Sequence, residues 1–495
     1  MPRALRRALL ATAVLLAGIA PGPAQAANGV PACATGRASG SEARATLDRL
    51  LNTERRHLRA RLHDVPPARA RAAGDVLTAG IAAYVYGFPD VLLRRTVATF
   101  PRNQMVSIAE LASPRTRTVV APNHDTLYSV AQIDLADGPM VLQTPPTGGR
   151  YSVIQLLDTF TNAFAYLGDG AGARTGETVA LVPPGWRGTL PGGVTELPSP
   201  SKVVWLLGRT LVDGDEDVAS ARELMAQYAM TPLPEYVSSR RRATLVLDAF
   251  PAGREAVRVP GGVAFFDELG AALAADPPPA RDACALRGFR IAGVGPGRAP
   301  GRAATGLGAR ALRAAAAAGP RVLGRLVAAG RSERAAEWTA LPANTGRFAT
   351  DYATRAVVAR VGLGANTVEQ ALYPTTSRDS RGRRLDGRHG YSVRFAPGAL
   401  PPVDQFWSLT LYGSRLALVD NPLGRFAIGD RTRGLRRDRD GGLTIRVSHR
   451  APAGRARPNW LPAPVGRFSL YLRLYEPKPA ASSGRWRPPP VVRVG

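Results

Sequence analysis

The spacing of the hydrophobic residues changes three times along this chain, and that alternation constrains the fold more than any other sequence feature. Residues 41–99 carry apolar side chains at helical spacing, and residues 116–211 switch to the period of two that is typical of half-buried strands. Residues 263–364 are rich in alanine and interrupted by Gly/Pro turns, which indicates short helices, and a period of two returns over 391–475. The sequence therefore predicts a mixed α and β fold, mainly β, with helices that join and flank two β modules.

The same changes of pattern predict how the chain is divided. A helical N-terminal region precedes a first β module, a helical connector and a second β module, and the end of the chain is rich in proline and arginine, which predicts a loose tail. The expected boundaries are 1–26 for a signal peptide, 27–99 for the N-terminal region, 100–235 for the first β module, 236–365 for the connector, 366–478 for the second β module and 479–495 for the tail.

The first 26 residues have the order of a secretory signal. Arg3, Arg6 and Arg7 precede an apolar run over 8–20, and the small residues at 24–26 form a signal peptidase site. The alternative is a membrane anchor, but about 13 apolar residues fall short of the ~20 that span a bilayer. We therefore expect cleavage after Ala26 and a secreted or extracytoplasmic protein with no transmembrane segment in the mature chain.

If the chain is exported, its number of cysteines bears on whether it forms a disulfide. Cys33 and Cys284 are the only two cysteines, and outside the cytosol an even pair is more often oxidised than reduced. We expect a disulfide between them, and two unrelated thiols are the alternative. Neither residue lies in a CxxC pair, so a redox motif and a thiolate zinc site find no support.

The net charge is +27, with 65 basic and 38 acidic residues, and only Lys202 and Lys478 are lysines. The arginines alternate with acids, as in 430–440, and no helix-turn-helix, zinc finger or aromatic-basic RNA-binding stripe is found, so we expect no nucleic-acid partner. An anionic envelope polymer, a small molecule or further copies of the chain remain possible partners, and a compositional preference for arginine is the plainest reading of the charge.

Several short motifs arrive in an order that resembles two known domain families. The segments 84–89 (YVYGFP), 122–128 (PNHDTLY) and 208–210 (GRT) resemble the domain-of-unknown-function family DUF1254, and a later group is similar to DUF1214, which commonly follows it. The resemblance covers about 72–477. It implies two antiparallel β-sandwich modules of jelly-roll kind joined by helices, and it implies no established biochemical role. The later group comprises Asn366, Tyr373, Asp386, Gly387, Tyr391, Pro401, Pro402, Phe406, Trp407, Ser408, Asn421, Pro422 and 459–464 (NWLPAP).

The polar cluster ahead of the strand that begins near Thr126 is the first candidate site. An imidazole beside a carboxylate can act as an oriented general base, so His124, Asp125 and Tyr128 are candidate catalytic residues and Asn123 a candidate ligand-binding residue. The alternative is local, because Asn and Asp side chains also cap turns by bonding their own backbone.

Two further groups are candidate ligand-binding residues. Asp158, Thr159 and Asn162 follow a β-patterned segment and reach the same mouth as His124 if the strand order brings both loops to one end; a polar turn is the alternative. Asn459 and Trp460 lie in a proline-rich loop, where the indole either stacks on a planar ligand or packs inward and locks the loop.

No pattern predicts a cofactor or a metal centre. The five histidines show neither HExxH nor HxH spacing, and GxSxG, phosphate-loop and dinucleotide fingerprints do not occur in the required context. Two function classes stay open. One is a secreted binding or structural envelope protein, which the lack of a recognisable catalytic constellation favours, and the other is a secreted hydrolase-like enzyme that uses His124 and Asp125 as an acid/base pair.

Overall fold

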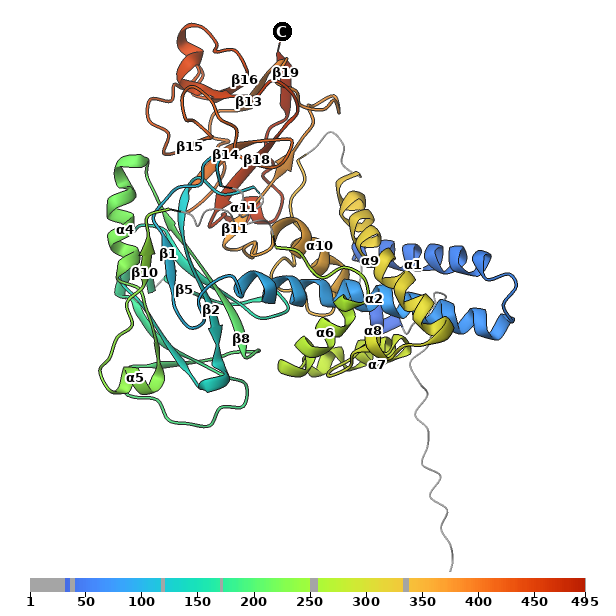
Figure 1. The fold of residues 1–495 in the computed structure, drawn as a ribbon. Coiled ribbons are helices and arrows are strands. Elements are labelled where there is room, and N and C mark those ends of the chain that lie inside the picture. Colours follow the sequence, from blue (N-terminus) through green and yellow to red (C-terminus); the bar gives the residue numbers. More distant parts are fainter. Residues whose placement is uncertain are drawn as a thin grey trace, which may run out of the picture.

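The computed structural model shows a mixed fold of helices and strands, as predicted, in three parts (Figure 1). The helical unit lies on the right of the figure, the first β module on the left and the second β module at the top. The predicted signal peptide, 1–26, lies outside the described residues. The structure describes residues 32–35, 41–116, 121–169, 172–249, 257–332 and 338–494.

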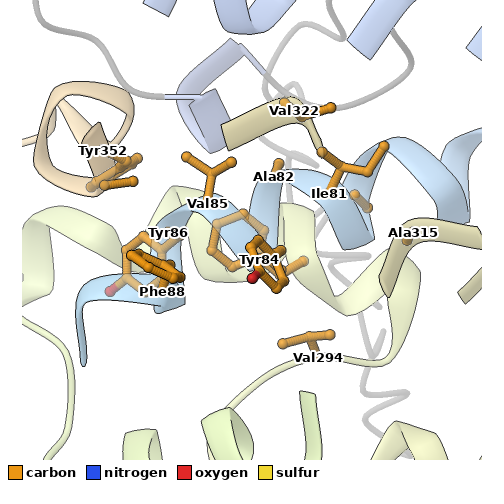
Figure 2. Close-up of a cluster of buried hydrophobic side chains, with 14 of the residues drawn as sticks. Ile81, Ala82, Tyr84, Val85, Tyr86, Phe88, Val294, Ala315, Val322 and Tyr352 are labelled. Carbon is orange, nitrogen blue, oxygen red and sulfur yellow. The ribbon is translucent and has the colours of Figure 1, made fainter. Parts of the chain in front are cut away.

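The helical unit is built around one long helix, α2 (Pro67–Val97), which begins with proline at its first position and is buried over most of its length. Aromatic and aliphatic side chains of α2 pack against neighbouring helices, as Figure 2 shows for Tyr84 and Tyr86 of α2 and for Tyr352 of a neighbouring helix. Although α2 is long and apolar enough to span a membrane, 94% of its most apolar window is buried inside the protein. The other helices of the unit are α1 (Glu42–Arg61), α6 (Ala264–Ala275), α7 (Ala283–Phe289), α8 (Pro300–Ala303), α9 (Gly306–Ser332) and α10 (Tyr352–Gly362).

The predicted disulfide is present. Cys33 in the short helix η1 (Ala32–Thr35) is bonded to Cys284 in α7, with the two Cα atoms 5.9 Å apart. The bond fastens the start of the described chain to the helical unit across a sequence separation of 251 residues.

The first β module consists of two packed sheets, one six-stranded in the order β10-β1-β2-β8-β4-β5 and one four-stranded in the order β7-β6-β3-β9. Leucine, isoleucine and methionine side chains of both sheets form one core. Pairing is antiparallel except at β10 and β7, which lie parallel to their neighbours at the sheet edges. The strands are β1 (Val106–Ile108), β2 (Thr126–Asp134), β3 (Met140–Thr144), β4 (Ser152–Leu157), β5 (Ala163–Leu167), β6 (Glu177–Val182), β7 (Thr195–Pro198), β8 (Val203–Leu211), β9 (Ala229–Pro232) and β10 (Leu245–Leu247), and α3 (Gly172–Thr175), α4 (Val218–Ala226) and α5 (Leu233–Val237) connect them.

The second β module repeats this two-sheet arrangement, with the orders β11-β18-β14-β15 and β17-β16-β13-β19, and β12 pairs with β18 beside the first of them. Its core gathers side chains from both sheets. The jelly-roll connectivity that the resemblance implies stays a prediction. The strands are β11 (Ala371–Leu372), β12 (Thr375–Thr376), β13 (Gly390–Phe395), β14 (Trp407–Gly413), β15 (Ala427–Gly429), β16 (Leu443–Ser448), β17 (Trp460–Pro462), β18 (Phe468–Tyr475) and β19 (Val491–Val494).

The prediction of a loose tail is wrong. Residues 479–494 include α11 (Pro479–Ser482) and β19, and β19 pairs antiparallel with β13. Val491 is buried, and the Trp486 indole donates to the Ala399 carbonyl at 3.1 Å. Backbone pairing and these two side chains outweigh the proline-rich composition that suggested disorder.

Candidate functional site

The two β modules enclose a cleft of about 370 Å³ at their junction. The first module contributes the residues before β2 and the turn between β8 and α4, and the second contributes β15 and the loop that follows it. Most of the lining side chains are polar or charged. They are Leu111, His124, Asp125, Val212, Asp213, Gly214, Asp215, Glu216, Ala427, Gly429, Arg431, Thr432 and Arg433.

Asp125 joins the two modules at the base of this cleft. Its carboxylate is buried and accepts hydrogen bonds from Ser408 Oγ at 2.6 Å and from Arg431 at 2.9 Å, and both donors belong to the second module. Arg431 also donates to the Val212 carbonyl at 2.7 Å and stacks over the Phe406 ring at 4.5 Å. Ser408 therefore holds the Asp125 side of the ion pair, and Val212 and Phe406 hold the Arg431 side. The ion pair fixes the relative position of the two cleft walls.

His124 lines the same cleft but is oriented by a different group. Its Nδ1 lies 2.6 Å from the Ala112 carbonyl, and its ring meets Phe426 edge to face at 4.8 Å. Because a carbonyl can only accept, Nδ1 carries the proton and the neutral ring keeps Nε2 as an acceptor. The predicted pairing of His124 with Asp125 is not formed, since both Asp125 oxygens are engaged across the junction.

Asn123 caps the turn before β2, which is the alternative given for it above. Its Oδ1 accepts from the Asp125 backbone N–H at 2.7 Å. Its Nδ2 donates to Thr126 Oγ1 at 3.0 Å and to the Tyr475 hydroxyl at 2.6 Å, which adds a second contact between the modules. The side chain is buried, and it does not line the cleft.

Tyr128 lies behind the cleft rather than in it. It sits on β2 directly opposite Arg209 of β8, and it is half-buried. Burial raises the pKa of its hydroxyl. The residue therefore belongs to a tyrosine-rich layer between the modules.

The second predicted group folds into a turn of its own. The Asp158 carboxylate accepts from the Asn162 backbone at 2.8 Å and from its amide at 2.9 Å, and Thr159 N–H donates to Ser201 Oγ at 3.3 Å. Asn162 Oδ1 accepts from Phe348 N–H at 3.2 Å, so the turn faces the segment before α10. Burial raises the pKa of Asp158.

Strand direction explains why the two polar loops do not share a mouth. β2 and β4 both pair antiparallel with β8, so they run in the same direction. Residues 123–125 precede β2 and residues 158–162 follow β4, which places the loops at opposite ends of the sheet, roughly 20 Å apart for a strand of this length. Asp158, Thr159 and Asn162 therefore do not converge on His124, and they form the polar turn that was the alternative.

Asn459 and Trp460 make structural contacts. The Trp460 indole is buried and donates to the Ser448 carbonyl at 2.8 Å. Asn459 accepts from Arg436 N–H at 2.8 Å, and its amide donates to the carbonyls of Arg436 and Thr444. These contacts correspond to the loop-locking alternative, and neither residue lines the cleft.

The cleft is acidic on a basic protein. Four carboxylates and two guanidinium groups line it, which gives a formal charge of −2 with histidine neutral. Arg431 is paired with Asp125, and exposed Arg433 lies 3.1 Å from exposed Glu216. Asp213 and Asp215 form no ion pair within the part of the chain that the structure describes, and both are exposed.

Sequence analysis missed the residues that the second module contributes. The alternation of arginines and acids over 430–440 does not single out Arg431, which reaches back to Asp125, 306 residues earlier. The acidic turn 213–217 directly after β8 is a usable signal for the other wall, because polar residues at a strand end are free to face a ligand. Among the described residues, no group of three or more His, Cys, Asp or Glu side chains could hold a metal ion.

The protein thus consists of two packed-sheet modules that are joined by buried hydrogen bonds and share one cleft. Residues 102–232 match the family described as Protein of unknown function (DUF1254), and residues 370–479 match Protein of unknown function (DUF1214). The chain thus carries the predicted pair of domains, in the predicted order. Residues that suggested the two families contact each other across the junction, as Asp125 and Ser408 do.

The fold is shared with a solved structure. The crystal structure of the VPA0106 protein from Vibrio parahaemolyticus is similar with a TM-score of 0.63 and 24% identity, over 85% of this chain and all of that one. A putative uncharacterized protein from Burkholderia cenocepacia is matched over 92% of this chain and 95% of its own, with 15% identity and a TM-score of 0.39. No curated protein matches the chain.

Proposed function

We propose that this is an extracytoplasmic binding protein whose inter-module cleft takes a small organic cation, such as an amine. The observation that carries the proposal is the charge of the cleft, which is formally −2 on a chain whose net charge is +27. At physiological ionic strength the Debye length is about 8 Å, so the local carboxylates dominate the field that a bound ligand experiences.

The geometry supports a binding role over a purely structural one. The Asp125–Arg431 pair joins a buried carboxylate to a half-buried guanidinium, and further contacts hold both side chains, so the pair supplies a fixed base. Asp213 and Asp215 lie on one wall with no ion-pair partner among the described residues. A ligand that brings a positive charge gains from both carboxylates without breaking an existing pair.

Putrescine and 1,4-butanediol test this proposal, because they share a carbon chain and differ in charge. Isothermal titration should detect putrescine binding and no binding of the diol. Asp213→Asn combined with Asp215→Asn should weaken the affinity about fivefold or more, which corresponds to about 1 kcal/mol. Glu196→Gln, an exposed acid on the edge strand β7, is the matched control and should change nothing. Equal behaviour of diamine and diol would overturn the proposal.

The extracytoplasmic location rests on the sequence of residues 1–26 together with the disulfide. Mass spectrometry of the protein recovered from the producing cells tests it. The expected N-terminus is Ala27, and exported material that begins at Met1 would contradict the proposal.

A second candidate function, hydrolysis, is favoured by one observation. His124 presents its ring to the cleft with Nδ1 bonded to the Ala112 carbonyl, which leaves Nε2 able to accept a proton from water or a substrate hydroxyl. Turnover of an ester panel that is lost in His124→Gln, but not in a distant His449→Gln control, would support this function. No turnover by the wild-type protein would count against it.

A further inference from the structure

A layer of tyrosines and one buried arginine lies behind the cleft, where the first module meets the segment that leads into the second. Arg209 stands on the central strand β8, and the residue is only 7% exposed. The tyrosines come from both modules and surround it. They are Tyr128, Tyr151, Tyr166, Tyr373 and Tyr475.

Among the described residues, Arg209 is hydrogen-bonded only to neutral oxygens. It donates to Gln155 Oε1 and Asn366 Oδ1, each at 2.9 Å, and to the Gly364 carbonyl at 2.6 Å. Across the described ranges of the chain, no carboxylate forms an ion pair with it. The guanidinium is charged nonetheless, because arginine is not deprotonated in proteins. A buried charge without a counter-ion is costly, which makes the position unusual.

The layer also contains an unused donor. Tyr151 is buried against the rings of Phe406 and Tyr475, with centroid separations of 5.5 and 5.3 Å. Its hydroxyl is buried and has no hydrogen-bond partner among the described residues. A buried hydroxyl normally finds a partner. The Tyr151 hydroxyl and the Arg209 guanidinium lie near each other, so both can bind the same small ligand.

Other members of the layer retain accessible surface. Tyr128, Tyr166 and Tyr373 are half-buried rather than fully buried. The Tyr373 hydroxyl accepts from Asn366 at 3.0 Å, and the Tyr166 hydroxyl accepts from Thr367 N–H at 3.0 Å. Both hydroxyls keep a hydrogen to donate.

We propose that Arg209 and the tyrosines around it form a binding site for a small carboxylate. One guanidinium supplies one compensating charge, and neutral hydroxyl donors complete the shell, which suits a monoanion. The site is separate from the acidic cleft in chemistry, and the inference does not rest on the cation proposed for that cleft.

Acetate and its neutral isostere acetamide test the site in the full-length protein at constant ionic strength. Ultraviolet difference absorption of the tyrosines should saturate with acetate and show no saturation with acetamide. Tyr151→Phe should raise the Kd for acetate at least tenfold, since a hydrogen bond to a charged group contributes about 1.5–3 kcal/mol. The Tyr151→Phe variant should be at least as stable to heat as the wild type, because the hydroxyl that is removed has no hydrogen-bond partner among the described residues.

Tyr228→Phe is the matched control. Its hydroxyl is bonded to Ser152, and its ring packs in the core between the two sheets of the first module. The control should lose stability and bind acetate as the wild type does, the reverse of Tyr151→Phe. Arg209→Gln should abolish the acetate signal, and if that variant does not fold, Tyr151→Phe decides. Acetate binding unchanged in Tyr151→Phe, or acetate and acetamide behaving alike, would show that Arg209 is only a clamp between β8 and the segment 364–366.

Discussion

Asp125→Asn should loosen the junction between the two β modules. The substitution keeps the size of the side chain but removes its charge, and an amide has only one oxygen for the two donors that Asp125 now satisfies. Each hydrogen bond to a charged group contributes about 1.5–3 kcal/mol, and the Arg431 side chain, 21% exposed, can recover part of its loss from water. We therefore expect a loss of about 2–4 kcal/mol, which is less than for a fully buried pair.

The assay is thermal and urea unfolding, with a double-mutant cycle that adds Arg431→Gln. The coupling free energy between the two positions should fall at about 1–3 kcal/mol, as for contacting residues in one network. Asp440→Asn is the control, because Asp440 pairs with Arg394 on the surface, where both side chains are about half exposed; such pairs contribute at most about 1 kcal/mol. If Asp125→Asn costs no more than Asp440→Asn, the junction is not held by this ion pair and the reasoning fails.

Three further predictions concern stability. Burial raises the pKa of Asp90 to about 6, above its unfolded value near 4, so the folded state keeps the proton to higher pH and stability should fall as pH rises from about 4 to about 6. In Asp90→Asn the urea midpoint of unfolding should depend less on pH over that window, and an unchanged pH dependence would refute the assignment. Reduction of Cys33–Cys284 should cost no more than ~5 kcal/mol, and peptide mapping that finds both thiols free in the oxidised protein would contradict the bond. Gly87→Ala should destabilise α2 by about 1–3 kcal/mol despite its better helix propensity, because the added Cβ would lie 2.4 Å from the Leu269 side chain; a rise in melting temperature would contradict this.

Local patterns predicted the fold class, because period-two alternation and helical spacing report directly on one-sided burial. The shortest strands could not be predicted from the spacing of apolar residues. β10 (Leu245–Leu247), within the predicted helical connector, pairs with β1, and β19 (Val491–Val494) pairs with β13, yet three or four residues are too few to establish a period. Backbone pairing with a distant strand fixes such segments.

The candidate site was predicted only in part, for a related reason. His124 and Asp125 stand out because they cluster ahead of a strand, and both line the cleft. Their partners do not follow from neighbouring residues, since Ser408 and Arg431 come from the other module. The position of Asp158 depended on the direction of β4 relative to β2, which alternation alone leaves open.

Hydrogen–deuterium exchange with and without putrescine tests most directly whether both modules form one binding cleft. We expect slower exchange, at saturating putrescine, in both 212–216 of the first module and 427–433 of the second, and we expect 1,4-butanediol to produce neither change. Slowing confined to one module, or equal slowing with the diol, would contradict a shared cation-binding cleft.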